Sequence, residues 1–299
     1  MNILIAANSK SGSGEGSGFS PEDLKAEFSK HGITPEIYDI EDHSPVDILK
    51  HIESGNYDVV AASGGDGTIS MIAGLLQGKD IALGVIPSGT LNHFSKDLNI
   101  PLTAEGSVKL IATGEFSYID TSSVNGRLFL NNSSIGMYPH AVRKREIQQS
   151  KLRRTKWLSM FYGVYSVLRK FPLYAVRIKT KNEILLFRSP IVFIGNNEYS
   201  VELLSMGSRK SLSGGKLSLY LARSNTRMKM LKLVLYAFMN RLKDSGELEM
   251  RLEDEVVIES KKKSLSVSID GEVETMRPPL YYRINRNNLK VIFPKKTDK

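Results

Sequence analysis

The first part of the chain alternates apolar runs with amphipathic polar segments, a pattern that predicts strands and helices in turn. Four short apolar runs indicate buried strands: residues 2–7, 36–40, 57–62 and 81–86. Helix starts lie between them at Ser20 and Ser44, because serine caps a first turn and the proline after it fits the first helical position. A further helix is expected over residues 68–77, and a short one after Asn92. This βαβα order predicts a parallel sheet with helices on both faces.

Beyond about residue 116 the pattern changes to short alternating strands, separated by turn signals such as Asn125-Gly126 and Lys181-Asn182. Five segments are typical of strands: residues 215–222, 255–260, 264–269, 280–285 and 289–293. Helical segments are expected near residues 151–170 and 226–242. The sequence therefore predicts an α/β domain over residues 1–120 and an antiparallel β-sandwich over residues 121–286, with a tail near 287–299 that could pack back on the first domain.

Composition narrows the classes of protein. A chain of 299 residues is longer than a single hydrophobic core usually supports. The absence of cysteine excludes disulfides, thiolate metal sites and cysteine nucleophiles. No signal peptide or membrane-spanning run of about 18 apolar residues is recognised. A net charge of +9 favours polyanionic partners: nucleotide phosphates, an anionic membrane surface or nucleic acid. We expect a cytoplasmic protein, with peripheral attachment to the inner face of the membrane left open.

The strand at residues 57–62 runs into Gly64, Gly65, Asp66, Gly67 and Thr68. Glycines allow backbone N–H groups to approach an anion closely, and a helix that starts here adds free N–H donors. Asp66 cannot itself ligate phosphate, so it is expected to hold Mg²⁺ or to act as a base. The structural alternative is a tight turn with Asp66 as a helix cap. The motif predicts a phosphate site.

Polar loops follow three of the predicted strands, at residues 8–16, 64–68 and 87–92. Because the carboxyl ends of parallel strands meet at one edge of a sheet, these loops are expected to converge there on a ligand. The candidate nucleotide-binding residues are Asn8, Ser9, Lys10, Ser11, Gly64, Gly65, Asp66, Gly67, Thr68, Ser88, Gly89, Thr90 and Asn92.

These loops resemble those of the bacterial lipid kinases of the diacylglycerol kinase catalytic-domain family, which is related to sphingosine and ceramide kinases. The matching segments cover nearly the whole chain: residues 8–14 (with Ser9 where the family has proline), 64–68, 84–92, 131–136 and 269–272. The resemblance implies a nucleotide-binding α/β domain followed by a β-sandwich, with the active site in the cleft between them. Two further features depart from the family: Met71 replaces a usual glutamate, and residues 212–215 lack the acids that hold a structural Mg²⁺ in bacterial members.

The resemblance also implies roles. The reaction would be transfer of the γ-phosphoryl group of ATP to the hydroxyl of diacylglycerol or a similar lipid. Asp270 is then the first choice for the general base, with Glu272 and Asp66 at a catalytic Mg²⁺ and Asp66 orienting the nucleotide and metal. Asp66 as the base remains an alternative. Asp270-Gly271 could also be no more than a hairpin turn.

A basic segment from Arg143 to Lys156 precedes Trp157 and further aromatic residues. Such a segment suits an anionic membrane interface, or it is a solvated helix whose aromatic side chains pack on the sandwich. Three other functions stay open. NAD kinases share the residue 64–68 motif but have a different second loop, and a non-catalytic nucleotide-binding or membrane-binding protein is compatible with Met71. Nucleic-acid binding rests on charge alone and ranks last. Oligomeric state is not indicated.

Overall fold

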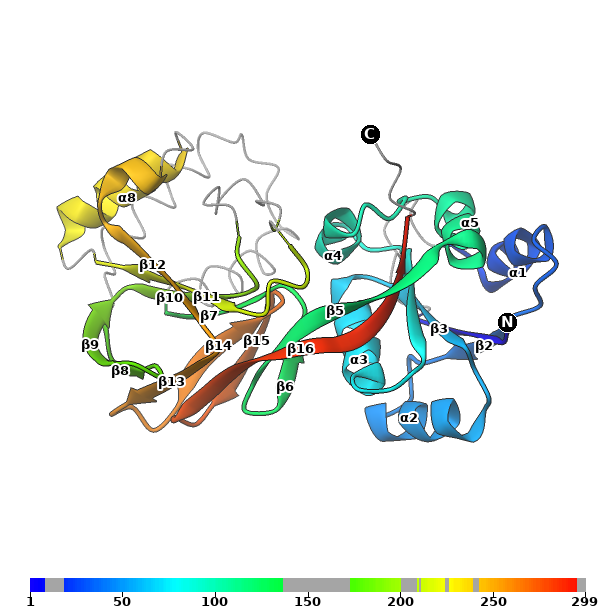
Figure 1. Cartoon of the computed structure of the whole chain (residues 1–299), viewed down its shortest axis with the longest axis horizontal. Coiled ribbons are helices and arrows are strands. Elements are labelled where there is room, and N and C mark those ends of the chain that lie inside the picture. The colour runs from blue at the N-terminus through cyan, green and yellow to red at the C-terminus, as the bar shows by residue number, and fades with distance from the viewer. Residues whose placement is uncertain are drawn as a thin grey trace. The chain divides into compact units, whose positions relative to one another are not determined.

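The computed structural model describes most of the chain: residues 1–8, 19–136, 173–199, 209, 211–223, 226–238 and 242–294. The chain divides into two compact units (Figure 1). Unit 1 comprises Met1–Thr121 and Asn285–Lys299, and unit 2 comprises Ser122–Ile284. The expected helix near residues 151–170 and the basic segment lie outside the described residues.

Unit 1 is built on a parallel sheet, as the sequence predicts. Its strand order is β2-β1-β3-β4, with all three pairings parallel. The strands are β1 (Ile3–Ala7), β2 (Glu36–Asp39), β3 (Val59–Gly64) and β4 (Ala82–Pro87). The end of β16 (Leu280–Phe293) joins this sheet beside β4, where Val291 pairs in parallel with Leu83.

Helices cover both faces of this sheet (Figure 1). They are α1 (Pro21–Ser29), α2 (Pro45–Ser54), α3 (Asp66–Leu76), α4 (His93–Asp97) and α5 (Ala104–Thr113). The serine caps act as expected: the Ser20 hydroxyl accepts from the backbone N–H of Asp23 at 3.1 Å, and Ser44 caps α2 in the same way. The sequence did not indicate α5, whose cap is Thr103.

Successive side chains of β1 and β3 point to opposite faces of the sheet, so the core of unit 1 has a part on each face. Odd-numbered residues of β1 and β3, such as Ile5 and Ala61, pack against Phe28 of α1 and Ile111 of α5. The even-numbered Leu4 and Val60 are equally buried, on the opposite face. A strand buried on both faces reads as a continuous apolar run, which is why these strands are so evident in the sequence.

Unit 2 is an antiparallel β-sandwich, as expected. One sheet has the order β12-β11-β10-β7-β14-β15, and the second contains β13, β8 and β9 together with the start of β16. The remaining bounds are β5 (Glu115–Val124), β6 (Arg127–Phe129), β7 (Asn132–Gly136), β8 (Tyr174–Lys179), β9 (Ile184–Ser189), β10 (Ile191–Asn196), β11 (Leu217–Ala222), β12 (Leu248–Glu253), β13 (Glu255–Ser260), β14 (Leu265–Ile269) and β15 (Glu272–Met276). Side chains from both sheets share one core, including Leu219 and Val267 from the first and Val176, Ile258 and Tyr282 from the second.

Two element boundaries differ from the sequence prediction. Residues 280–293 form the single strand β16 rather than two strands. The polar residues in its middle interrupt the apolar pattern but not the strand, and Asn287 takes a positive φ of 45° while its N–H donates to Asp120. The helix expected over residues 226–242 is α8 (Arg227–Phe238), followed by the separate 3₁₀ turn η1 (Leu242–Ser245). Among the described helices, none is long and apolar enough to cross a membrane.

Candidate active site

The glycine-rich loop after β3 leads directly into α3. Gly65 is the N-cap of this helix and provides no side chain to cap it. The first N–H groups of any helix lack acceptors within the helix, and the N-terminus carries partial positive charge. The backbone N–H groups of Asp66, Gly67 and Thr68 are therefore positioned to bind an anion such as a phosphate group.

The loop after β4 packs against this first loop. Ser88 N–H donates to the Gly64 carbonyl at 3.0 Å. A Cβ atom added to Gly89 would lie 2.6 Å from Cα of Gly65, so only glycine permits this approach of the two backbones. Asn92 adopts a left-handed conformation with φ 49°, and its side chain accepts from Gly89 N–H at 3.1 Å and donates to the Gly89 carbonyl at 2.8 Å. The second loop is thus braced from within.

Asn8 connects the end of β1 to the same edge. Its N–H donates to the Ser63 carbonyl at 3.0 Å, and its side-chain amide donates to the Thr68 hydroxyl at 3.2 Å. The structure therefore brings together the described nucleotide-binding candidates of all three loops in unit 1. Ser9, Lys10 and Ser11 lie outside the described residues.

Asp66 forms contacts with the start of the neighbouring helix α4. Its two carboxylate oxygens accept from the N–H groups of His93 at 3.2 Å and Phe94 at 3.3 Å. The acid at the start of α3 thereby caps α4. Asp66 is thus a helix cap, as in the structural interpretation of the motif, but it caps α4 and not its own helix α3. A carboxylate has about four acceptor positions, so these contacts are compatible with a bound metal ion.

Asp270 and Gly271 form the two-residue turn of the β14–β15 hairpin, with φ values of 47° and 95°. The Asp270 carboxylate accepts three backbone hydrogen bonds, from Leu130 at 2.8 Å, Asn131 at 2.8 Å and Asn132 at 3.0 Å. We call this arrangement the Asp270 clamp. Hydrogen bonds of this kind stabilise the ionised form of a carboxylate and orient it.

The carbonyl groups of the same segment are also held. Arg209 donates to the Leu130 carbonyl at 2.6 Å and the Asn196 amide donates to it at 2.8 Å. The peptide group between Leu130 and Asn131 therefore accepts from a cation at its oxygen and donates to Asp270 at its nitrogen. Hydrogen bonds in such a chain polarise and strengthen one another. Neither Arg209 nor Asn196 could be predicted from the sequence, because only the fold brings them to this segment.

Glu272 begins β15 and is exposed. Its carboxylate lies 3.5 Å from the guanidinium of Arg127, which also pairs with Glu274 at 3.2 Å. Among the residues that the structure describes, no three His, Asp or Glu side chains form a group suited to a metal ion.

Residues 2–124 match the family model of the diacylglycerol kinase catalytic domain. This part of the chain is therefore similar to the catalytic domain of the diacylglycerol kinase family. An uncharacterised protein of Synechocystis is 26% identical over 238 residues, which cover 76% of this chain and 54% of that protein. A diacylglycerol kinase of Staphylococcus aureus strain JH9 is 39% identical over 83 residues, 27% of this chain and 26% of that one. The chain thus matches about half the length of the first relative and about a quarter of the second.

The fold of this chain is similar to that of solved protein structures. A crystal structure described as a diacylglycerol kinase from Bacillus anthracis superposes with a TM-score of 0.69 at 17% identity, covering 99% of this chain and 98% of that one.

The structure also locates Met71 and residues 212–215, which depart from the family pattern. Met71 lies half-buried on α3, and residues 212–215 precede Lys216, whose ammonium group pairs with Asp254 at 3.0 Å. No carboxylate from residues 212–215 is available to bind a structural Mg²⁺.

Proposed function

We propose that this protein is a lipid kinase that transfers the γ-phosphoryl group of ATP to the hydroxyl of diacylglycerol or a similar lipid. The observation that carries the proposal is the close packing of two glycine loops at the uncapped start of α3, where Gly89 faces Gly65. Phosphoryl transfer depends mainly on positioning and on neutralising charge, and this arrangement offers both to a nucleotide. The match of residues 2–124 to the diacylglycerol kinase catalytic domain supports a lipid as the acceptor.

A Mg²⁺ ion fits the residues present. In nucleotide sites Mg²⁺ is usually held by one or two carboxylates together with the phosphates, not by a protein cage. Asp66, next to the phosphate-binding N–H groups, and Glu272 are the acids proposed to hold it. When bound, the ion would neutralise charge on the transferred group.

The general base is proposed to be Asp270, with Asp66 as the alternative. A base must be ionised before it accepts the proton of the lipid hydroxyl, and the Asp270 clamp supplies three N–H groups that favour the ionised carboxylate. The same bonds also reduce its basicity. The clamp therefore supports a role in orienting the acceptor hydroxyl at least as strongly as a role in removing its proton.

The test is incubation of the purified protein with ATP labelled at the γ-phosphate, Mg²⁺, and a panel of lipid alcohols in detergent micelles, with NAD in parallel. We expect label in a lipid product that partitions into organic solvent. Label in NADP, or in no product, would refute the proposal, and the first outcome would identify an NAD kinase.

Variants connect the activity to the site. Asp66→Ala and Asp270→Asn should each abolish phosphorylation, while Asp80→Asn, a change at an acid with 83% exposure elsewhere in unit 1, should leave it unchanged. Thermal unfolding measured alongside shows whether each variant still folds. Full activity of either site variant on a verified acceptor would remove that residue from the mechanism.

A further inference from the structure

Strand β9 lies at the edge of the second sheet of unit 2 and exposes aliphatic side chains. Ile184 is 63% exposed and Leu186 is 77% exposed. Leu185 and Phe187, which alternate with them, pack against the core. The exposed pair therefore lies on the outer side of the sheet, where burial in the fold gives no reason for apolar residues.

The register extends this apolar pair into a wider surface. Leu186 lies opposite Arg177 of β8, and Ile184 lies opposite Lys179. Lys179 is in turn opposite Val257 of β13, which is opposite Tyr281 of β16. Paired residues point to the same side of a sheet, so these side chains form one surface, on which Tyr281 is 58% exposed. We call the outer side of β9, β8, β13 and the start of β16 the β9 face.

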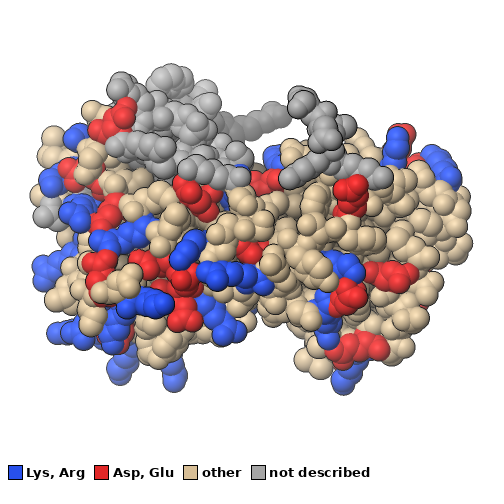
Figure 2. Space-filling model, in the orientation of Figure 1, with Lys and Arg blue, Asp and Glu red and all other residues tan. Residues whose placement is uncertain are grey.

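Cations predominate on and around the β9 face. They come from the strands and from the exposed turns at their ends: Arg177, Lys179, Lys181, Arg188, Lys261, Lys262, Lys263 and Arg283. Figure 2 shows basic side chains, with acidic ones among them, over the part of unit 2 that contains β8 and β13.

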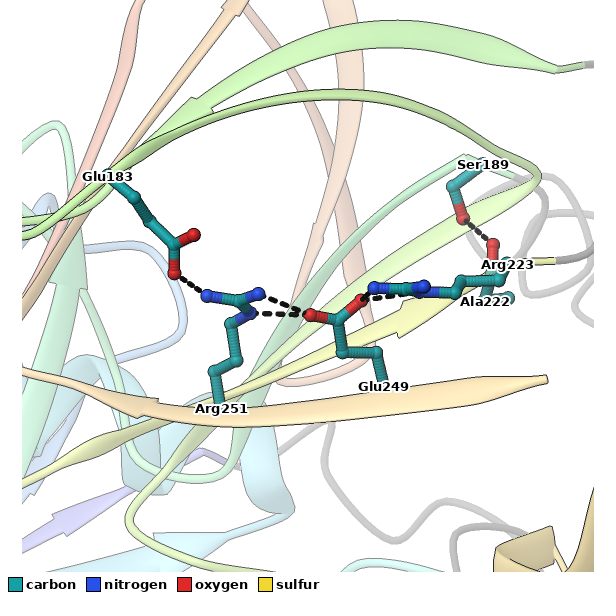
Figure 3. A network of polar contacts seen from close by, with 6 residues as sticks. All are labelled: Glu183, Ser189, Ala222, Arg223, Glu249 and Arg251. Carbon is teal, nitrogen blue, oxygen red and sulfur yellow. Dashed lines mark hydrogen bonds and ion pairs between the residues drawn. The ribbon is translucent and has the colours of Figure 1, made fainter. Parts of the chain in front are cut away.

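Three acids lie on or beside the β9 face, fewer than the cations: Glu183, Glu255 and Glu259. Glu255 lies opposite Arg283 in the register of β13 and β16. Glu259 lies 2.6 Å from the Lys179 ammonium and 3.7 Å from the Arg177 guanidinium. Glu183, beside Ile184, pairs with Arg251 of β12, which belongs to a chain of ion pairs that continues through Glu249 (Figure 3). The β9 face therefore combines exposed aliphatic groups with a net positive charge.

We propose that the β9 face docks on an anionic lipid bilayer. Aliphatic and aromatic side chains enter the headgroup region while surrounding lysines and arginines bind anionic headgroups, which is how interfacial surfaces attach to membranes. A second copy of this chain is a poorer occupant, because it would bring the same cations against these ones. The biological purpose of this docking rests on the proposed lipid kinase function, but the docking itself can be measured without any reaction.

The experiment is sedimentation of the protein with vesicles of phosphatidylcholine and phosphatidylglycerol, and with vesicles of phosphatidylcholine alone, in the absence of ATP. We expect binding to the anionic vesicles only. Replacing both aliphatic residues, Ile184→Ser with Leu186→Ser, should weaken the partition coefficient at least about tenfold. Arg188→Glu should weaken it at least about fivefold and reduce its salt dependence.

A matched control lies on the exposed side of α2 in unit 1. Val46, 60% exposed, and Lys50 are also an exposed apolar residue beside a cation, so Val46→Ser with Lys50→Glu should leave vesicle binding unchanged. Thermal unfolding should be the same for all variants, because the substituted side chains are exposed.

Three outcomes would overturn the proposal: no vesicle binding by the wild type, binding unchanged in the β9-face variants, or a change of oligomeric state in those variants with vesicle binding intact. The last would make the face a protein interface. Kinase assays separate this proposal from the proposed function, because the variants should keep the wild-type rate on detergent-dispersed lipid and lose rate on vesicles. If the wild type phosphorylates no lipid, the proposed function fails while the binding result still decides the docking.

Discussion

Replacing Asp270 by glycine isolates the contribution of its carboxylate to the fold. Asp270 has a φ of 47°, which glycine adopts without strain, so the hairpin turn should survive the change. What is lost is the Asp270 clamp, whose three N–H donors lie 2.8 to 3.0 Å from the carboxylate. Two of the donor residues, Leu130 and Asn131, are 0% and 6% exposed.

The magnitude follows from the number and type of bonds. A hydrogen bond to a charged group contributes about 1.5–3 kcal/mol, and an unsatisfied buried donor costs about 1–3 kcal/mol. Asp270 itself is half-buried, so water can reach part of the site and the three losses are less than additive. We expect Asp270→Gly to lower the free energy of unfolding of unit 2 by about 3–5 kcal/mol.

Asn125→Gly is the matched control. Asn125 also occupies a hairpin turn, with φ 48°; its side-chain oxygen accepts a neutral bond from Tyr281 N–H at 2.8 Å, and its side-chain nitrogen donates a long one to the Pro279 carbonyl at 3.4 Å. The backbone change is the same, so its cost should be only about 0.5–1.5 kcal/mol. Urea unfolding followed by circular dichroism measures both. Equal destabilisation of the two variants would show that the clamp contributes nothing beyond the neutral hydrogen bonds of an ordinary turn asparagine.

Three further changes have defined outcomes. Gly89→Ala places a methyl group 2.6 Å from Cα of Gly65, so the two loops must move apart: the Km for ATP should rise at least about tenfold, the free energy of unfolding should fall by about 1–3 kcal/mol, and an unchanged Km would contradict the packing argument. Arg209→Met removes a charged donor from the carbonyl side of the Asp270 clamp and should cost about 1.5–3 kcal/mol by urea unfolding, whereas Arg209→Lys should recover part of it. The hydrogen bond from Tyr57 lowers the pKa of Glu36. The bond therefore stabilises the fold at pH values above the ordinary pKa of a carboxyl group, and this stabilisation is lost as the pH falls and Glu36 becomes protonated. In Tyr57→Phe the pKa of Glu36 should rise, as NMR titration would show; an unchanged value would assign the shift to another cause.

The α/β part of the fold could be predicted well because its signals are local. Each strand is a short apolar run, and Ser20 and Ser44 cap their helices through bonds to residues only three positions away. The first glycine loop could be placed for the same reason, since strand, glycines and helix are consecutive in the chain. Helix α5 is missing from the sequence prediction although its signals are also local: Thr103 caps its start, and Val108 and Ile111 are buried at helical spacing.

The contacts of the acids could not be predicted, because they depend on residues far apart in the sequence. Asp270 binds a segment 138 to 140 positions earlier, and Asp66 caps a helix 27 positions later. A sequence pattern shows that a carboxylate follows a strand, but not which N–H groups it will meet. For both residues the sequence left a structural and a catalytic interpretation open. The observed contacts give the structural interpretation its detail: Asp66 caps α4, and Asp270 holds residues 130–132.

These contacts change how the proposed acids should be understood. Asp66 and Asp270 each bind backbone N–H groups, so each is held in place by the fold before any substrate arrives. A group fixed in this way needs little reorganisation when charge develops nearby, which is the main requirement for electrostatic catalysis. It also means that a loss of activity after substitution has two causes, the missing charge and the displaced backbone. Asp270→Asn separates them, because asparagine keeps one acceptor oxygen for the clamp: a folded, inactive variant would show that the ionised carboxylate itself is required.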